Sequence, residues 1–71
     1  MPLFADKLKD LRKNKNVTQK QVAKAIGIAE RNYRRLEAEN NPSVETTIKL
    51  AEYFQVSTDY LLGLTDNPER Q

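Results

Sequence analysis

The chain has 71 residues, with 12 Lys and Arg against 10 Asp and Glu, and a formal net charge of +2. It contains neither cysteine nor histidine, which excludes disulfides, thiol chemistry and the commonest metal ligand and general acid–base residue. Charges occur from Asp6 onward, and no apolar run approaches the roughly 20 residues of a membrane span. We expect one small cytoplasmic domain without a signal peptide, metal, cofactor or small-molecule ligand.

The charges are unevenly distributed along the chain. Residues 1–36, the basic half, hold ten Lys and Arg against three acids, a balance of +7. Residues 37–71, the acidic half, hold two basic residues against seven acids, a balance of −5. Helix surfaces are usually charged, so chance scatter is one interpretation, but a split of this size favours a basic half that faces a polyanion.

Hydrophobic spacing predicts two helices in the first part of the chain. Phe4, Leu8 and Leu11 recur at helical intervals and indicate a helix over about residues 3–14. Thr18 is a good N-cap for a second, short helix. Gly27 stands where a helix ends in a left-handed residue. The buried stripe of this second helix is expected to be Val22, Ala23 and Ile26.

Three further helices are predicted after Gly27. A third begins near Ala29, carries Arg31, Arg34 and Arg35, and is broken by the stretch Asn-Asn-Pro at 40–42. Ser43 caps a fourth, and Ser57 caps a short fifth that ends near Gly63. The apolar face of the fourth helix is expected to comprise Val44, Thr47, Ile48, Ala51 and Phe54. The fold class is therefore an all-α, compact five-helix bundle, with a domain over residues 1–66 and a frayed polar tail over 67–71.

Two stretches carry a family resemblance, TQKQVAKAIGIAERNYRRLE at 18–37 and PSVETTIKLAEYFQVSTDYLLG at 42–63. Together they resemble the phage repressor and Cro family, also called the XRE family of bacterial regulators, over roughly residues 7–64. The resemblance implies a lambda-repressor-like DNA-binding domain that contains a helix-turn-helix. That family often has Ser or Thr where this chain has Ala29, so the third helix is expected to lack a side-chain N-cap.

The resemblance implies DNA contacts for named residues. In this fold the N-terminal part of the third helix enters the major groove, where arginine can bind guanine and glutamate can accept from cytosine. The base-reading candidates are Glu30, Arg31 and Arg35. The candidates for the DNA backbone are Thr18, Gln19, Lys20, Arg34 and Asn40. Two alternatives stay open: Gln19 is an ordinary solvent-exposed glutamine, and Glu30 pairs with Arg34 one turn away.

Two structural features are also expected. By the same resemblance, Arg12 and Glu37 match a partly buried ion pair that ties the first helix to the third. Tyr60, Leu61 and Leu64 offer more apolar surface than one short helix can hide, which predicts a dimer interface at the C-terminal end. The alternative is that Leu61, and Tyr60 with it, are core residues of a monomer.

The function that this sequence favours is a sequence-specific DNA-binding transcriptional regulator, a repressor that binds a near-palindromic operator as a homodimer. The alternative is a protein-interaction module of the same fold, an antitoxin or a partner of another regulator, with the acidic half as its surface. An enzyme is disfavoured because no nucleophile–base arrangement is visible, and the Ser, Thr and Asp residues are better explained as helix caps.

Overall fold

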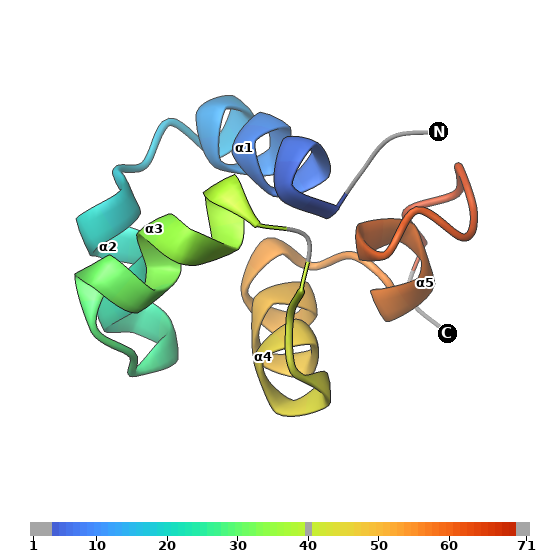
Figure 1. The fold of residues 1–71 in the computed structure, drawn as a ribbon. Helices are drawn as coiled ribbons and strands as arrows, with labels where there is room; N and C mark the ends of the chain where they lie inside the picture. The colour runs from blue at the N-terminus through green and yellow to red at the C-terminus, as the bar shows by residue number, and fades with distance from the viewer. Residues whose placement is uncertain (1–3, 40, 70–71) are drawn as a thin grey trace.

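The computed structural model describes residues 4–39 and 41–69, which fold into five helices (Figure 1). These are α1 (Phe4–Lys15), α2 (Gln19–Ile26), α3 (Glu30–Ala38), α4 (Val44–Phe54) and α5 (Thr58–Leu61). No strand occurs in these two ranges, so the predicted all-α five-helix architecture is confirmed. None of the described helices is long and apolar enough to cross a membrane.

Local capping interactions fix the bounds of α2. The Thr18 hydroxyl accepts from the Gln21 backbone N–H at 3.1 Å, and the Gln21 side-chain oxygen accepts from the Thr18 N–H at 2.7 Å. This reciprocal capping box satisfies two donors that a helix start otherwise leaves free. Gly27 ends the helix in the left-handed region, at φ 77° and ψ 33°. Both ends are as predicted from the sequence, and Ala29 likewise gives α3 no side-chain cap.

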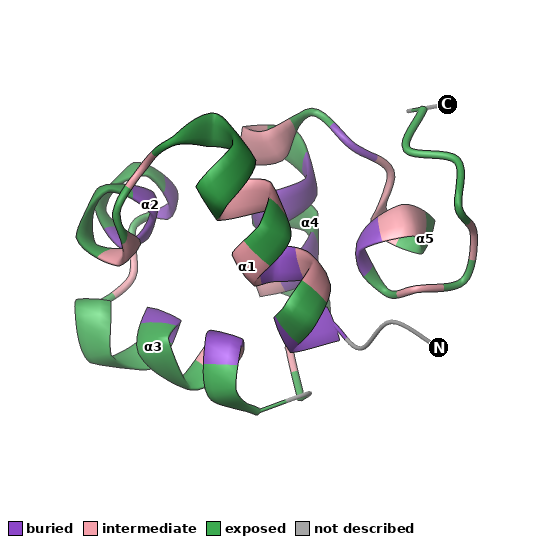
Figure 2. Cartoon of the chain, turned by 90° about the horizontal axis from the view of Figure 1, so that it is seen from above, coloured by how far each residue is buried: buried purple, intermediate pink, exposed green. Residues whose placement is uncertain are grey.

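The core lies where all five helices meet. Its largest fully buried side chains come one from each helix, and they are Leu8, Val22, Tyr33, Leu50 and Leu61. Ala23 is 2% exposed where α2 packs against α3, because a larger side chain would hold these helices apart. Figure 2 shows buried positions on all five helices, alternating with exposed positions along each helix except the short α5.

The buried face of α4 differs from the predicted one. Val44 is 78% exposed and Ile48 is 45% exposed, so the predicted apolar face is not the face that the fold buries. The buried residues of α4 are Thr47, Leu50 and Ala51, because the helix is rotated so that Leu50 lies in the core. The buried Thr47 hydroxyl is satisfied, since it donates to the Ser43 carbonyl oxygen at 2.8 Å.

Residues 65–69, the C-terminal segment, fold back onto the domain. The Ser57 backbone N–H donates to the Pro68 carbonyl oxygen at 3.0 Å. The Thr65 hydroxyl accepts from the Asn67 N–H, and the Asn67 side chain accepts from the Glu69 N–H. Within the predicted tail, residues 67–69 make these bonds, and the Pro68 carbonyl supplies a hydrogen-bond partner to the residue before α5. Residues 70 and 71 of that predicted tail lie outside the described residues.

Candidate nucleic-acid interface

The outer face of α3 presents three exposed arginines, Arg31, Arg34 and Arg35. Tyr33, on the opposite side of the helix, is fully buried. Helical spacing places Arg31 and Arg35 one turn apart on one face. Neither of them makes an ion pair with another described residue. Two guanidinium groups are therefore free to bind a ligand on the outside of α3.

Glu30 stands at the first position of α3 and pairs with Arg34. The distance from Arg34 Nη1 to Glu30 Oε2 is 3.9 Å, and the two side chains are 58% and 43% exposed. Exposed pairs one turn apart in a helix contribute only about 0.3–0.5 kcal/mol. The pair therefore forms in the unbound protein, yet it opens at little cost when either side chain meets another partner.

Arg12 and Glu37 form the predicted ion pair between α1 and α3. Arg12 Nε donates to Glu37 Oε2 at 2.6 Å, and Arg12 Nη2 donates to Glu37 Oε1 at 3.2 Å. Glu37 is 3% exposed and Arg12 is 18% exposed. Arg12 Nη1 also donates to the Val17 carbonyl oxygen, which fixes the loop before α2. The pair thus joins α1, the loop and α3 in a two-pronged geometry that lysine could not provide.

The pKa values of the pair follow from these contacts. The hydrogen bond to Glu37 raises the pKa of the Arg12 guanidinium. Burial acts to raise the pKa of the Glu37 carboxyl, but the hydrogen bond from Arg12, the neighbouring Tyr33 hydroxyl and the hydrogen bond from Gln19 together outweigh burial and hold that pKa below its usual value. Both groups are therefore charged at neutral pH, and each stabilises the charged form of the other.

Gln19 belongs to the same cluster. Its side-chain Nε2 donates to Glu37 Oε1 at 3.2 Å, and the residue is half-buried. This contact was not predicted, because the two residues are 18 positions apart and only the fold brings them together. Gln19 is thus not simply solvent-exposed: Glu37 orients its amide at the start of α2, beside the exposed Thr18 and Lys20.

The Tyr33 hydroxyl is buried close to this cluster. It makes no hydrogen bond within the described part of the chain. Burial, and then the neighbouring Glu37 carboxylate, raise the pKa of this hydroxyl. Tyr33 therefore stays neutral and serves as the apolar anchor that fixes α3 with its arginine face outward.

A sequence profile of the helix-turn-helix family matches residues 8–61 of this chain, which include all of α2, the turn at Gly27 and α3. The chain belongs to this helix-turn-helix family. The match confirms the resemblance drawn from the sequence.

The chain is also similar to several curated proteins. The chain is 41% identical over 68 residues to "Uncharacterized HTH-type transcriptional regulator YobD" of Bacillus subtilis, which covers 94% of the chain and 61% of the relative. It is 38% identical over 58 residues to "HTH-type transcriptional regulator ImmR" of the same species, and this match covers 80% of the chain and 46% of the relative. It is 36% identical over 67 residues to "Cryptic phage CTXphi transcriptional repressor RstR" of Vibrio cholerae, and this match covers 93% of the chain and 60% of the relative. The chain thus spans about half to three fifths of the length of these relatives.

The C-terminal end of this helix-turn-helix protein only partly fits the predicted dimer surface. Leu61 is fully buried, so its side chain belongs to the core and offers nothing to a second copy; the prediction is corrected for this residue. Tyr60 is half-buried, with the Lys7 ammonium 4.0 Å from its ring centroid. Leu64 is 70% exposed, and Leu62, which was not predicted, is 41% exposed.

Two remaining site predictions concern Asn40 and metals. Asn40 was expected to contact the DNA backbone, but it lies outside the described residues. Among residues 4–39 and 41–69, no group of three or more acidic, His or Cys side chains is placed to hold a metal ion.

Proposed function

We propose that this protein is a sequence-specific DNA-binding transcriptional repressor that binds a near-palindromic operator as a homodimer. The observation that carries the proposal is the outer face of α3, where Arg31 and Arg35 are exposed and unpaired among the described residues. In a helix-turn-helix unit this helix lies in the major groove. There, each guanidinium can donate to O6 and N7 of a guanine.

Glu30 supports a base-reading role in a second way. Its pair with Arg34 is long and exposed, so the carboxylate can exchange this partner for a cytosine amino group. Arg34 would then be released toward a phosphate. Glu30 is thus proposed as a base reader whose charge is balanced in the free protein, so that it does not repel the DNA backbone before binding.

The start of α2 supplies the proposed backbone contacts. Thr18, Gln19 and Lys20 lie there, where first-turn N–H groups and the helix dipole favour a phosphate. Such contacts set the position of the protein on the duplex but carry no base information. The excess of +7 in the basic half would strengthen them through the release of counterions.

A two-fold arrangement accounts for the proposed operator. Two recognition helices of a dimer lie about 34 Å apart, which is one turn of DNA. Tyr60 and Leu64, together with the exposed Leu62, are the proposed contact surface between copies. The name of the RstR relative, a phage transcriptional repressor, supports repression as the outcome, by occlusion of a promoter.

In vitro selection of bound duplexes from a random pool tests the proposal directly. We expect an enriched motif of two inverted half-sites with centres about one helical turn apart, and at least one guanine in each half-site. Selection that enriches no motif at low salt would overturn the proposal of sequence-specific binding. A single half-site without an inverted repeat would overturn the dimer instead.

A further inference from the structure

Three hydrogen bonds converge on the Glu37 carboxylate, and only two of them belong to its ion pair with Arg12. Oε2 accepts from Arg12 Nε at 2.6 Å, and Oε1 accepts from Arg12 Nη2 at 3.2 Å. Oε1 also accepts from Gln19 Nε2 at 3.2 Å. Glu37 is 3% exposed, whereas Gln19 is half-buried at the first position of α2. A buried acid of α3 thus holds a side chain that lies at the proposed DNA face.

The chemistry of a carboxylate decides which end of the Gln19 amide faces inward. An ionised carboxylate only accepts hydrogen bonds, whereas a glutamine amide has two N–H donors on its nitrogen and an acceptor at its oxygen. The nitrogen must therefore face Glu37. Gln21, in the same turn of α2, is held by the opposite end, because its Oε1 accepts from the Thr18 backbone N–H at 2.7 Å. The orientation of Gln19 is thus set by a contact across the fold and not by the local cap.

This arrangement leaves one N–H of Gln19 Nε2 without an acceptor. The bond to Glu37 uses one of the two N–H groups, and the second donates to no group in the described part of the chain. The phosphate oxygens of DNA are hydrogen-bond acceptors, as the carboxylate is. The second N–H is therefore the side-chain group by which Gln19 can bind the DNA backbone, and its nitrogen then lies between two anions.

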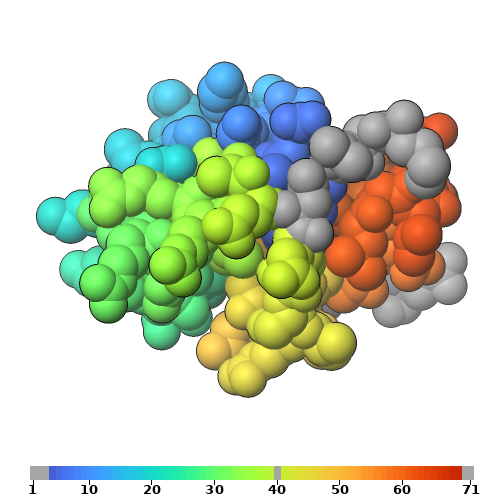
Figure 3. All heavy atoms as spheres, in the orientation of Figure 1, coloured from blue at the N-terminus to red at the C-terminus, as the bar shows by residue number. Residues whose placement is uncertain are grey.

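Arg12 prevents these two anions from opposing each other. A carboxylate and a phosphate that share one amide would repel at such short range. The Arg12 guanidinium lies against Glu37 with two hydrogen bonds, so the pair carries no net charge toward a phosphate. Figure 3 shows α2 and α3 together at one end of the molecule, with α5 at the other. The pair is thus placed where it can support DNA binding.

We propose that Glu37 is a positioning residue for DNA binding, and that Gln19 Nε2 bridges its carboxylate and a phosphate oxygen. This inference rests on the proposed DNA-binding function. A glutamine without such a partner turns about its side-chain bonds and presents either end of its amide, of which the carbonyl oxygen repels a phosphate. Glu37 fixes the donor end before DNA arrives, which lowers the cost of ordering this contact. Glu37 therefore contributes to DNA affinity although it touches no DNA.

A double-mutant cycle tests the affinity part of the proposal. The probe is a duplex of about 20 base pairs and arbitrary sequence at low salt, since a phosphate contact does not depend on sequence. Gln19→Met removes the amide, keeps the length of the side chain and should weaken binding about tenfold. Glu37→Ala should weaken it about fivefold, at a temperature at which circular dichroism shows the variant folded. The double variant should bind as tightly as Gln19→Met alone, because Glu37 acts through Gln19.

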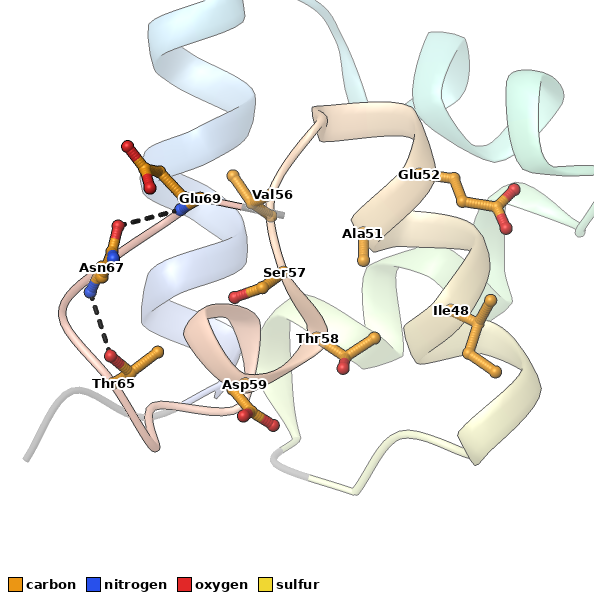
Figure 4. Close-up of a pocket in the computed structure, with 10 residues that line it drawn as sticks. All are labelled: Ile48, Ala51, Glu52, Val56, Ser57, Thr58, Asp59, Thr65, Asn67 and Glu69. Atoms are coloured by element: carbon orange, nitrogen blue, oxygen red, sulfur yellow. Dashed lines mark hydrogen bonds between the residues drawn. The ribbon is translucent and has the colours of Figure 1, made fainter. Parts of the chain in front are cut away.

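Glu52→Ala is the control for charge. It removes the same negative charge from an exposed side chain of α4, on a groove between α4 and the C-terminal segment (Figure 4). Removal of an acid raises the net charge, which favours binding to phosphates. Glu52→Ala should therefore bind the duplex at least as tightly as the unaltered protein. A loss of affinity in Glu37→Ala would run against the change in charge.

The Gln19 amide protons give a second readout, which a purely structural role of Glu37 would not move. In the unaltered, isotopically labelled protein, one Nε2 proton should be protected from exchange with water, because Glu37 accepts it. Addition of the duplex should shift and protect the other proton. In Glu37→Ala without DNA, neither should be protected. The measurement on the unaltered protein decides the proposal even if Glu37→Ala does not fold.

Each part of the proposal can fail separately. Losses that add in the double variant would show that Glu37 acts through the fold of α3, and equal binding by Glu37→Ala and Glu52→Ala would show that it does not act on DNA binding. A second Gln19 Nε2 proton that stays unprotected in the complex would remove the bridge. If no duplex binds at low salt, the proposed function itself fails. If duplexes bind but the Gln19 results fail, only the positioning role is lost.

Discussion

Arg12 and Glu37 are joined by two hydrogen bonds of 2.6 and 3.2 Å although they lie 25 residues apart, and this pair ties α1 to α3. The carboxylate is almost fully buried and also accepts from Gln19. One ion pair therefore connects the stability of the bundle with the orientation of a residue at the proposed DNA face.

Glu37→Ala is expected to lower the free energy of unfolding by about 2–4 kcal/mol, because it leaves a partly buried guanidinium without its partner. For a domain of this size, each kcal/mol corresponds to about 4–8 °C in melting temperature. Thermal unfolding followed by circular dichroism measures the change. Glu39→Ala is the matched control, since Glu39 is exposed and makes no ion pair with a described residue. Equal melting temperatures of the two variants would contradict a structural role of the pair.

Stability is expected to fall in acid through the same pair. The folded-state pKa of Glu37 is lowered, so the unfolded chain takes up the proton first, near its ordinary value of about 4.3. The contribution of Glu37 is therefore complete above that pH and is lost as the pH falls through the lower folded-state value. Urea unfolding between neutral pH and about pH 3 measures this. Glu37→Gln, which cannot titrate, should show a shallower loss over the same window; a parallel loss would assign the acid sensitivity to other carboxylates.

DNA binding is expected to weaken steeply with salt. A dimer that neutralises about 6–10 phosphates loses roughly 10³–10⁵ in binding constant between about 50 and 200 mM salt. Fluorescence anisotropy with a labelled operator duplex measures the slope. A binding constant that is independent of salt would show that the basic half does not face the phosphates.

Arg35→Ala is expected to reduce the binding free energy for the cognate duplex by about 1–3 kcal/mol and to relax the base preference at one base pair. The fold should be unaffected, because Arg35 is exposed and makes no ion pair with a described residue. Arg34 lies on the flank of the same helix. Arg34→Ala should weaken binding to cognate and scrambled duplexes about equally, and it should reduce the slope of log binding constant against log salt by about 1, the equivalent of one phosphate contact. If Arg35→Ala weakens binding to both duplexes equally while Arg34→Ala weakens binding only to the cognate duplex, the roles of base reader and backbone contact are reversed.

Leu61 and Leu64, at the C-terminal end, are expected to respond differently to substitution. Leu61→Ala should destabilise the fold by about 2–5 kcal/mol, because it leaves a cavity in the core. Leu64→Ser should leave the melting temperature nearly unchanged and weaken self-association, as measured by analytical ultracentrifugation. A protein that is monomeric both free and on operator DNA would rule out the interface at Tyr60 and Leu64.

The sequence by itself determined the features that depend on interactions within a few residues. Thr18 and Ser43 cap the helices that follow them, and Gly27 takes a positive φ, because capping bonds and backbone sterics act within about one helical turn. The arginine face of α3 was predictable for the same reason, since helical spacing alone separates Tyr33 from Arg31 and Arg35. The Arg12–Glu37 pair was predicted only through the family resemblance, as no local pattern links two residues so far apart.

Only the tertiary structure decided which apolar surfaces are covered and which distant polar groups meet. Leu61 is buried and Leu64 is exposed, although both are leucines of one short stretch, because only Leu61 faces the core that the other helices complete. The rotation of α4 that exposes Ile48, the contact of Gln19 with Glu37 and the Ser57–Pro68 bond all depend on packing between elements. Hydrophobic burial is not directional, so the sequence limits which side chains can be buried, and the packing of the helices selects among them.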